Sequence, residues 1–314
     1  MGQTLTMQHF SKTNIQAHFN HAAVSYDEAA VLQRTVAERL RERLELTTTK
    51  PKTILDIGAG TGALTEKVLQ DYPKANVIAM DLSIQMLEKA QQNLAPTGFL
   101  NILKQAFQPN RKTFVCADAN MIPLADNSVD LLVSNLMLQW CDDLDGVLTE
   151  FRRVLKPDAL LMVTSFGPDT LKELRRSWAE VDNEEHVNTF IDMHDFGDAL
   201  IRNGFGQPVM DVEHFTLTYQ KPIGVLKDLK AIGATNATKG RKTGLTGKQK
   251  FTAMLDAYET KRTNNLIPAT FEVIHGHAWA TPEVIKGPSR DKSGVYEINL
   301  DEFGKLPKQN TFKR

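Results

Sequence analysis

Apolar and polar positions alternate with two different periods along the first half of the chain. From Ser25 to about Leu46 the apolar residues recur every three or four positions, which predicts one amphipathic helix that ends before Pro51. Strands are then predicted at 53–58, 76–81, 113–118, 129–135 and 159–166, and helices at 63–71, 83–94 and 144–155. Strands rich in Val, Ile and Leu that alternate with helices indicate a parallel sheet covered by helices on both faces.

The pattern changes after Phe166. Positions 168–203 predict a helical segment that ends at Asn203 and Gly204, because glycine accepts the left-handed conformation at a helix C-terminus. Positions 208–219 and 269–279 alternate like strands, and a mainly helical segment with a Gly- and Lys-rich interruption at 237–250 separates them. We expect five regions: an N-terminal helical cap at 1–50, a core at 51–167, a helical insertion at 168–204, two last strands with a second helical insertion at 205–280, and a surface tail at 281–314.

Composition narrows the class of protein. The 314 residues include 37 Lys and Arg against 38 Asp and Glu, so the overall charge points to neither a nucleic acid nor a membrane surface as partner. The first residues lack the pattern of a signal peptide and no apolar run approaches the roughly 20 residues of a membrane span, so we expect a cytoplasmic protein. Cys116 and Cys141 have apolar neighbours and are expected to be buried, inert thiols. His275 and His277 alternate on a strand, but two ligands without a third are more often surface residues than a metal site.

A glycine-rich sequence, LDIGAGTGALT, joins the first predicted strand to a helix. Gly58, Gly60 and Gly62 would let the backbone approach a ligand closely. The same letters also satisfy a dinucleotide-binding pattern, with Asp81 at the end of the next strand about 20 residues later. Asp56 favours a different ligand, because an anion before the glycines would repel a pyrophosphate but suits a sulfonium compound with a free amino group. Asp118, at the end of the third strand, is placed to accept from an adenine amine.

These features, together with the Leu-Gln-Trp sequence at 138–140, resemble the class I S-adenosylmethionine-dependent methyltransferases over positions 24 to 166. The resemblance implies an α/β Rossmann-like fold whose seven-stranded sheet is mostly parallel with an antiparallel last strand, and S-adenosyl-L-methionine as cofactor. It implies that Asp56 and the glycines surround the methionine part, that Asp81 holds the ribose hydroxyls and that Met86 packs on the base. The full set of expected cofactor-binding residues is Asp56, Gly58, Gly60, Gly62, Asp81, Leu82, Met86, Asp118, Ala119 and Asn135.

Segments outside this core indicate the substrate. The chain lacks an Asn-Pro-Pro-Tyr type of tetrapeptide after the fourth strand, which counts against a nucleic-acid base or a glutamine as methyl acceptor. The stretches 19–34, 177–190 and 229–241 resemble the malonyl-acyl-carrier-protein O-methyltransferases of biotin synthesis, and this resemblance covers roughly 18 to 280. It implies esterification of the free carboxylate of a malonyl thioester, with acyl carrier protein as partner and with neither nucleic acid nor membrane involved. Another small acid or a quinone as substrate, or a cofactor-binding protein without turnover, remain the alternatives.

A carboxylate is already anionic at neutral pH and needs a positively charged or hydrogen-bonding clamp rather than a base. On a helix, Leu171, Leu174, Trp178 and Val181 form one apolar stripe with Arg175 at its edge and Arg176 pointing away. Arg175 is therefore the candidate clamp, with an ion pair to a glutamate as the alternative, and Arg202 and Arg34 are next in line.

Three further side chains are candidates for the substrate site. His186 could line the acyl pocket or cap a turn, and Tyr26 could supply a hydroxyl to the cofactor or the substrate or be a half-buried core residue. Trp140 is expected in the pocket wall. The basic residues Lys239, Arg241, Lys242, Lys248 and Lys250 form either a solvated loop or a surface for an acidic carrier protein.

Overall fold

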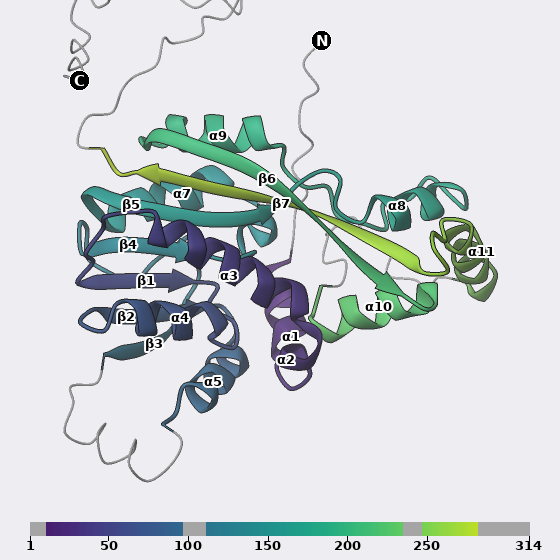
Figure 1. The fold of residues 1–314 in the computed structure, drawn as a ribbon, viewed down its shortest axis with the longest axis horizontal. Helices are drawn as coiled ribbons and strands as arrows, with labels where there is room; N and C mark the ends of the chain where they lie inside the picture. The colour runs from purple at the N-terminus through teal and green to yellow at the C-terminus, as the bar shows by residue number, and fades with distance from the viewer. Residues whose placement is uncertain (1–10, 97–110, 235–246, 282–314) are drawn as a thin grey trace, which may run out of the picture.

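The computed structural model describes residues 11–96, 111–234 and 247–281. Its centre is one seven-stranded sheet with the strand order β3-β2-β1-β4-β5-β7-β6 (Figure 1). The strands are β1 (Thr53–Ile57), β2 (Asn76–Asp81), β3 (Lys112–Cys116), β4 (Val129–Ser134), β5 (Leu155–Phe166), β6 (Gly206–Tyr219) and β7 (Ile267–Trp279). Strands β1 to β5 pair in parallel, whereas β7 runs antiparallel to both β5 and β6. The predicted fold class, including the antiparallel last strand, is confirmed.

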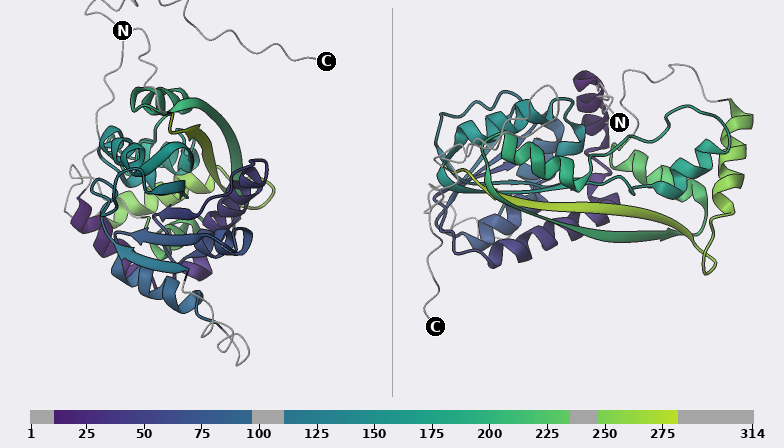
Figure 2. Two further views of the ribbon diagram at one scale, coloured as in Figure 1. Left: turned by 90° about the vertical axis from the view of Figure 1, so that its left-hand side faces the viewer. Right: turned by 90° about the horizontal axis from the view of Figure 1, so that it is seen from above.

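Helices cover both faces of this sheet, as the view along the strands shows (Figure 2, left). The helical elements are α1 (Lys12–Ala22), α2 (Tyr26–Ala29), α3 (Val31–Glu45), α4 (Ala63–Asp71), α5 (Ile84–Asn93), the 3-10 turn η1 (Leu138–Trp140), α7 (Leu144–Val154), α8 (Lys172–Ala179), α9 (Met193–Arg202), α10 (Pro222–Ala231) and α11 (Lys248–Glu259). Neighbouring strand residues point to opposite layers: Leu55 and Leu132 pack towards α7 and α9, whereas Ile54 and Leu131 pack towards α3 and α4. This two-sided burial explains why the central strands are apolar at successive positions.

Strands β6 and β7 extend beyond the rest of the sheet. β5 pairs with β7 only from Val273 to Trp279, whereas residues 267–272 of β7 pair with residues 214–219 of β6 alone. We call this two-stranded extension (214–219 with 267–272) the hairpin arm. It carries α8, α10 and α11 away from the parallel strands (Figure 1; Figure 2, right). The chain after β5 covers the open edge of the arm, since the Leu171 amide donates to the Thr270 carbonyl at 2.6 Å.

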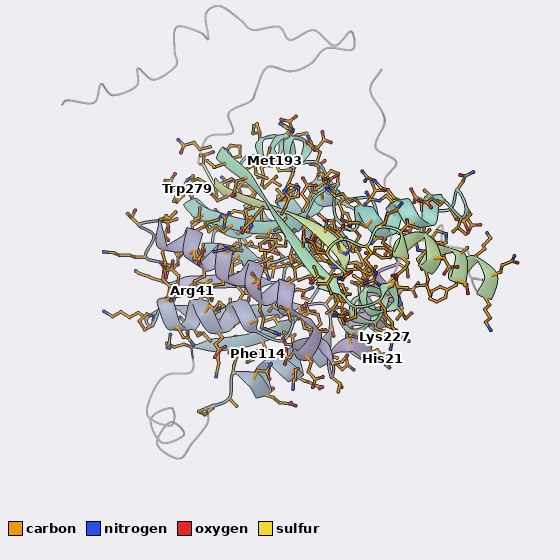
Figure 3. All side chains as sticks on the ribbon, turned by 45° about the vertical axis from the view of Figure 1, so that its right-hand side comes forward. His21, Arg41, Phe114, Met193, Lys227 and Trp279 are labelled. Carbon is orange, nitrogen blue, oxygen red and sulfur yellow. The ribbon has the colours of Figure 1, made fainter. Side chains whose placement is uncertain are left out.

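The helices of the hairpin arm contact the N-terminal helices. The Ser25 hydroxyl donates to the Ala231 carbonyl at 3.0 Å, which joins α2 to the end of α10. His21 and Lys227 mark this junction in Figure 3. The N-terminal helices therefore lie between the parallel part of the sheet and the helices of the arm, where they can contribute to both.

Several element predictions need correction. The helix predicted from 25 to 46 is divided at Ala30, which has non-helical backbone angles, into α2 and α3. Helix α1 lies within the expected helical cap but was not predicted as a helix of its own. The helical segment predicted over 168–203 is two helices, because residues 180–192 leave the helix and Asp192 starts α9 by accepting from the amide of His194 at 2.8 Å. Its predicted end is confirmed, with Gly204 in the left-handed region at φ 82°.

Cysteine burial was predicted only half correctly. Cys141 is partly buried, and its burial raises the pKa of the thiol to about 12. Cys116 is exposed, because it ends the edge strand β3, so the prediction of a buried thiol is wrong there. Within the three described ranges no helix has the length and apolar character that a membrane crossing requires. The predicted tail at 281–314 and the basic residues at 239–242 lie outside the described residues, except for Thr281.

Candidate active site

The glycine loop between β1 and α4 is held in place by its own backbone. The amides of Gly58 and Ala59 both donate to the carbonyl of Met80, at 2.8 and 3.1 Å, which ties the loop to the end of β2. Gly60 has a left-handed φ of 54°, and a Cβ built there would meet no atom within 4 Å, because this part of the loop faces a pocket. We call it the glycine-loop pocket. The backbone at Gly60 is thus open to close approach by a ligand.

Asp81 stands at the rim of this pocket and is fixed by two amides. One carboxylate oxygen accepts from the amide of Gly60 and the other from that of Ser83, both at 2.8 Å. Burial raises the pKa of the carboxyl, and these amides oppose that rise. Each oxygen still has a lone pair available to a ligand, so the carboxylate can accept from vicinal hydroxyls such as those of a ribose.

Most of the expected cofactor-binding residues converge on the glycine-loop pocket. Those that line it are Gly58, Gly60, Asp81, Leu82, Met86, Asp118, Ala119 and Asn135. Asp56 and Gly62 are not among the lining residues, and Gly62 ends the loop next to Ala90 of α5. Asp56 is 1% exposed, accepts from the Thr65 hydroxyl at 2.5 Å with one oxygen, and leaves the other without a partner among the described residues. Its burial raises the pKa of the carboxyl to about 7.

Helix α1 closes one side of the glycine-loop pocket. Lys12, Ile15 and Phe19 line the pocket, and Phe19 contacts the indole of Trp140 edge to face, with ring centroids 5.3 Å apart. The ammonium of Lys12 lies 2.5 Å from a carboxylate oxygen of Asp118. Sequence reasoning missed this helix because its apolar positions are sparse. Its start could have been recognised from Ser11, whose hydroxyl accepts from the amide three residues later.

A second pocket adjoins the first. Four residues, Phe19, Tyr26, Leu136 and Trp140, line both pockets. We call the second one the arm pocket, because β7 of the hairpin arm, α8 and the end of α10 contribute to its wall. Its apolar lining consists mainly of Phe166, Leu171, Leu174, Val187, Phe190, Leu229, Ile232 and Phe271. Its polar lining consists of Gln33, Gln139, Thr170, His186 and Asn188.

Tyr26 lies where the two pockets meet. Burial, with smaller contributions from the nearby carboxylates of Asp81 and Asp27, raises the pKa of its hydroxyl. The phenol therefore stays protonated at neutral pH and can donate a hydrogen bond. The structure places the predicted residue in the wall of both pockets, although the prediction that it takes part in the reaction stays a prediction.

His186 and Arg175 have different positions relative to the arm pocket. His186 lines it, stacks on Trp178 with ring centroids 3.6 Å apart, and hydrogen-bonds Asp182 at 2.8 Å. Arg175 is not among the lining residues. Its guanidinium donates to the carbonyls of Pro168, Thr170 and Asn188 at 2.8, 3.1 and 3.4 Å, and burial lowers its pKa. These partners are backbone carbonyls and not a glutamate, so the alternative interpretation of an ion pair is wrong.

Asn135 connects the two pockets to the N-terminal helices. Its side-chain amide donates to the carbonyl of Gln33 on α3 at 3.0 Å, and its side-chain oxygen accepts from the hydroxyl of Thr164 on β5 at 2.9 Å. Arg176 is exposed, as predicted, and so is Arg202, which pairs with Asp145. Lys250 pairs with Asp182 at 2.9 Å.

Three features define a class I S-adenosylmethionine-dependent methyltransferase. They are the seven-stranded sheet with its antiparallel β7, the glycine loop after β1, and the acidic residues that end β2 and follow β3. Residues 55–163 match the family model described as a methyltransferase domain. The chain belongs to the malonyl-[acyl-carrier protein] O-methyltransferase family.

Three relatives of that name illustrate the match. The protein of Laribacter hongkongensis is 48% identical over 85% of this chain and 89% of its own length. The protein of Nitrosospira multiformis is 46% identical over 86% of this chain and 90% of its own length. The protein of Halorhodospira halophila is 41% identical over 95% of this chain and 96% of its own length. Among solved structures, a putative methyltransferase from Bacillus halodurans superposes with a TM-score of 0.54 at 15% identity and covers 79% of this chain and 99% of its own, which shows the shared fold.

The cofactor of the protein is S-adenosyl-L-methionine, and the residues present fit it. The open space at Gly60 admits a ligand against the backbone, and the carboxylate of Asp81 stands at the rim of the same pocket. The unpartnered oxygen of Asp56 is a buried acceptor beneath the loop. The glycine-loop pocket therefore fits the cofactor, and we propose it as the cofactor site.

Proposed function

We propose that the protein transfers a methyl group to the free carboxylate of a malonyl group carried as a thioester by acyl carrier protein, which gives the methyl ester. The family relationship is the main support, because the relatives cover most of both chains and bear the name of this activity. In this family the reaction is an early step of biotin synthesis. The ester masks the charge of the malonyl carboxylate, so that the group can be elongated like an ordinary acyl chain.

The adjoining pockets suit this reaction. A malonyl carboxylate has a pKa near ~4 and is anionic at neutral pH, so it needs no general base. When bound, the cofactor supplies an electrophilic methyl group that passes from its sulfur to a carboxylate oxygen. We assign to the Tyr26 hydroxyl the role of donating a hydrogen bond to the carboxylate at the junction of the pockets. Phe19 and Trp140, which pack against each other there, exclude water and help to align the two reactants.

The test is methylation by the purified protein. We expect a methyl ester on malonyl-acyl carrier protein, detected by mass spectrometry as the replacement of one proton of the malonyl-carrying arm by a methyl group. Carrier protein without the malonyl group and free malonate are the controls. Malonyl-coenzyme A measures how much the carrier protein itself contributes. Cofactor binding without any methylated thioester would contradict the proposal and favour a protein without turnover, whereas methylation of another acid or a quinone alone would favour the other alternative.

A further inference from the structure

Two amide side chains of the arm pocket have a buried oxygen that accepts no hydrogen bond. They are Gln139 on η1 and Asn188 in the segment between α8 and α9, and within the described part of the chain neither side-chain oxygen has a partner. The orientation of Gln139 is fixed, because its Nε2 donates to the carbonyl of Leu136 at 2.6 Å. A carbonyl only accepts, so the NH2 group must face Leu136 and the other atom must be the oxygen.

The backbone of the segment that carries Asn188 is anchored as well, whereas its side-chain amide has no partner among the described residues and is free to turn its oxygen towards a donor. The guanidinium of Arg175 donates to its backbone carbonyl at 3.4 Å and to the carbonyls of Pro168 and Thr170 before α8. The two free acceptors thus come from two separately anchored elements. A buried acceptor without a donor is unfavourable, so such groups are normally satisfied by a ligand or by water.

The malonyl group cannot satisfy these oxygens. Its carboxylate and its thioester carbonyl both accept hydrogen bonds, and an acceptor facing an acceptor is repelled. The chain that carries the thioester is chemically different. In a pantetheine arm the sulfur is followed by secondary amides, and each of them has an N–H group that needs an acceptor once it leaves water.

We propose that Gln139 and Asn188 accept hydrogen bonds from the amide N–H groups of a pantetheine arm and thereby set the direction in which the thioester lies in the arm pocket. Gln139 precedes Trp140, which lines both pockets, so Gln139 receives the amide nearer to the sulfur. The malonyl carboxylate then points towards Tyr26 and the glycine-loop pocket. This inference rests on the proposed function and makes the two amides positioning residues that select a pantetheine thioester.

The experiment compares two malonyl thioesters, one of pantetheine and one of ethanethiol, which has the same reacting group but no amide. The variants Gln139→Met and Asn188→Leu keep the approximate size of each side chain and remove the acceptor. We expect kcat/KM for malonyl-pantetheine to fall by about 10-fold in each variant, the equivalent of one hydrogen bond of roughly 1.4 kcal/mol. With the ethyl thioester the same variants should change kcat/KM by less than about 2-fold, because that substrate offers no donor.

Three controls separate the possible outcomes. Gln70→Met, at an exposed position of α4, should behave like the wild type with both substrates. The dissociation constant for S-adenosylmethionine should be unchanged in Gln139→Met, which shows that η1 is intact. An equal loss with both thioesters would overturn the inference and assign the two oxygens to the packing of the pocket. Malonyl-acyl carrier protein is assayed alongside, and if the wild type does not methylate it the proposed function itself fails. Methylation of that substrate but of neither small thioester would overturn the inference that the two amides select a pantetheine thioester.

Discussion

The hydroxyl of Tyr26 is the donor that the junction of the two pockets offers to a carboxylate. Because the pKa of this buried phenol is raised, it remains a donor throughout the pH range of an enzyme assay. We predict that Tyr26→Phe lowers kcat/KM for the malonyl thioester by about 10-fold, the loss of one hydrogen bond. Cofactor affinity, measured by calorimetry, should stay within about 2-fold because the ring still fills the wall.

Tyr258 provides the matched control for this prediction. It is fully buried and its hydroxyl donates to the carbonyl of Pro268 at 2.9 Å, away from both pockets. Tyr258→Phe should therefore lower the thermal stability and leave kcat/KM unchanged. A loss of cofactor affinity in Tyr26→Phe as large as its loss of activity would instead assign the Tyr26 hydroxyl to the cofactor.

Asp81 allows a test of the cofactor site. In Asp81→Asn one carboxylate oxygen becomes an NH2 group, which must face the amide of either Gly60 or Ser83 and can no longer accept from a ribose hydroxyl. We predict at least a ~10-fold weaker binding of S-adenosylmethionine by calorimetry. Asp130→Asn is the control, since Asp130 also accepts from two amides, those of Lys52 and Thr53, at the opposite end of the sheet. Equal affinities in the two variants would contradict the assignment of Asp81.

Among single residues, the sequence predicted best the positions of those at or just after the end of a strand. Asp81 and Asp118 follow strands of a parallel sheet, so their convergence on one edge could be predicted. Asp56 lies inside the end of β1 and is covered by the loop, and spacing alone does not reveal which side of the loop a side chain takes. The partners of Arg175 are backbone carbonyls, which have no signature in the sequence.

Helix α1 adds a contact that competes with the expected role of Asp118. The ammonium of Lys12 engages the carboxylate that is expected to accept from the adenine amine. We predict that Lys12→Met strengthens S-adenosylmethionine binding by up to about 5-fold, because an exposed ion pair contributes at most about 1 kcal/mol. Lys74→Met is the control, because Lys74 is exposed and precedes β2, whereas Asp81 lies at the other end of that strand. Weaker binding in Lys12→Met would mean that Lys12 itself holds the cofactor.

Two adjacent arginines of α8 provide a test variant and its control for the role of this helix. Arg175 joins the start of α8 to the segment that carries Asn188, whereas Arg176 is exposed. We predict that Arg175→Ala lowers the free energy of unfolding by about 2 kcal/mol, since three carbonyls lose a charged donor, and lowers kcat/KM for the thioester. Arg176→Ala should change neither. Cofactor affinity should be preserved in both variants, as measured by calorimetry.

A full-stability Arg175→Ala variant with low activity would indicate a direct contact with the substrate. The structure favours a positioning role, because the guanidinium is occupied by Pro168, Thr170 and Asn188.

Element boundaries were harder to predict than element types. The alternation of apolar runs identified all seven strands, because each has apolar residues that pack on at least one face, although in the edge strand β3 they are only partly buried. The helical periodicity over 168–203 did not reveal the break between α8 and α9. There Asp182 accepts from the amide of Glu184 and from His186, and Asp192 caps the next helix. Such side-chain bonds compete with a helix locally and leave the apolar spacing unchanged.

At the scale of the whole molecule, the burial of His275 makes the free energy of unfolding depend on pH. It is 2% exposed in β7, neither ring nitrogen makes a hydrogen bond to another described residue, and burial lowers its pKa to about 4, with Arg43, Arg39 and Asp211 nearby. The expectation of a surface residue was therefore wrong. Between pH 6.5 and 4 the unfolded chain binds a proton at this residue that the folded protein does not, so His275 by itself lowers the free energy of unfolding by at most about 3 kcal/mol as the pH falls. The carboxylate of Glu213, 3.6 Å from its Nε2, favours the protonated ring and opposes this contribution.

His275→Leu should remove this dependence. Denaturant unfolding at several pH values should show the variant gaining stability relative to the wild type as the pH falls from 6.5 to 4.5. Asp56 acts in the opposite direction, because its pKa is raised to about 7 and the folded protein binds the extra proton between pH 7 and 3.8. Parallel curves for wild type and His275→Leu would contradict the assignment to His275.

The hairpin arm gives the two pockets different mechanical supports. The glycine loop is attached to the parallel strands, which have neighbours on both sides, whereas Phe271 and the helices around the arm pocket depend on a ribbon of two strands. Two-stranded ribbons twist more readily than wide sheets. A change of twist along 214–219 and 267–272 would widen or narrow the chamber for the acyl group while the cofactor stayed in place. We therefore expect the width of the arm pocket to depend on the twist of the hairpin arm, and the glycine-loop pocket to be independent of it.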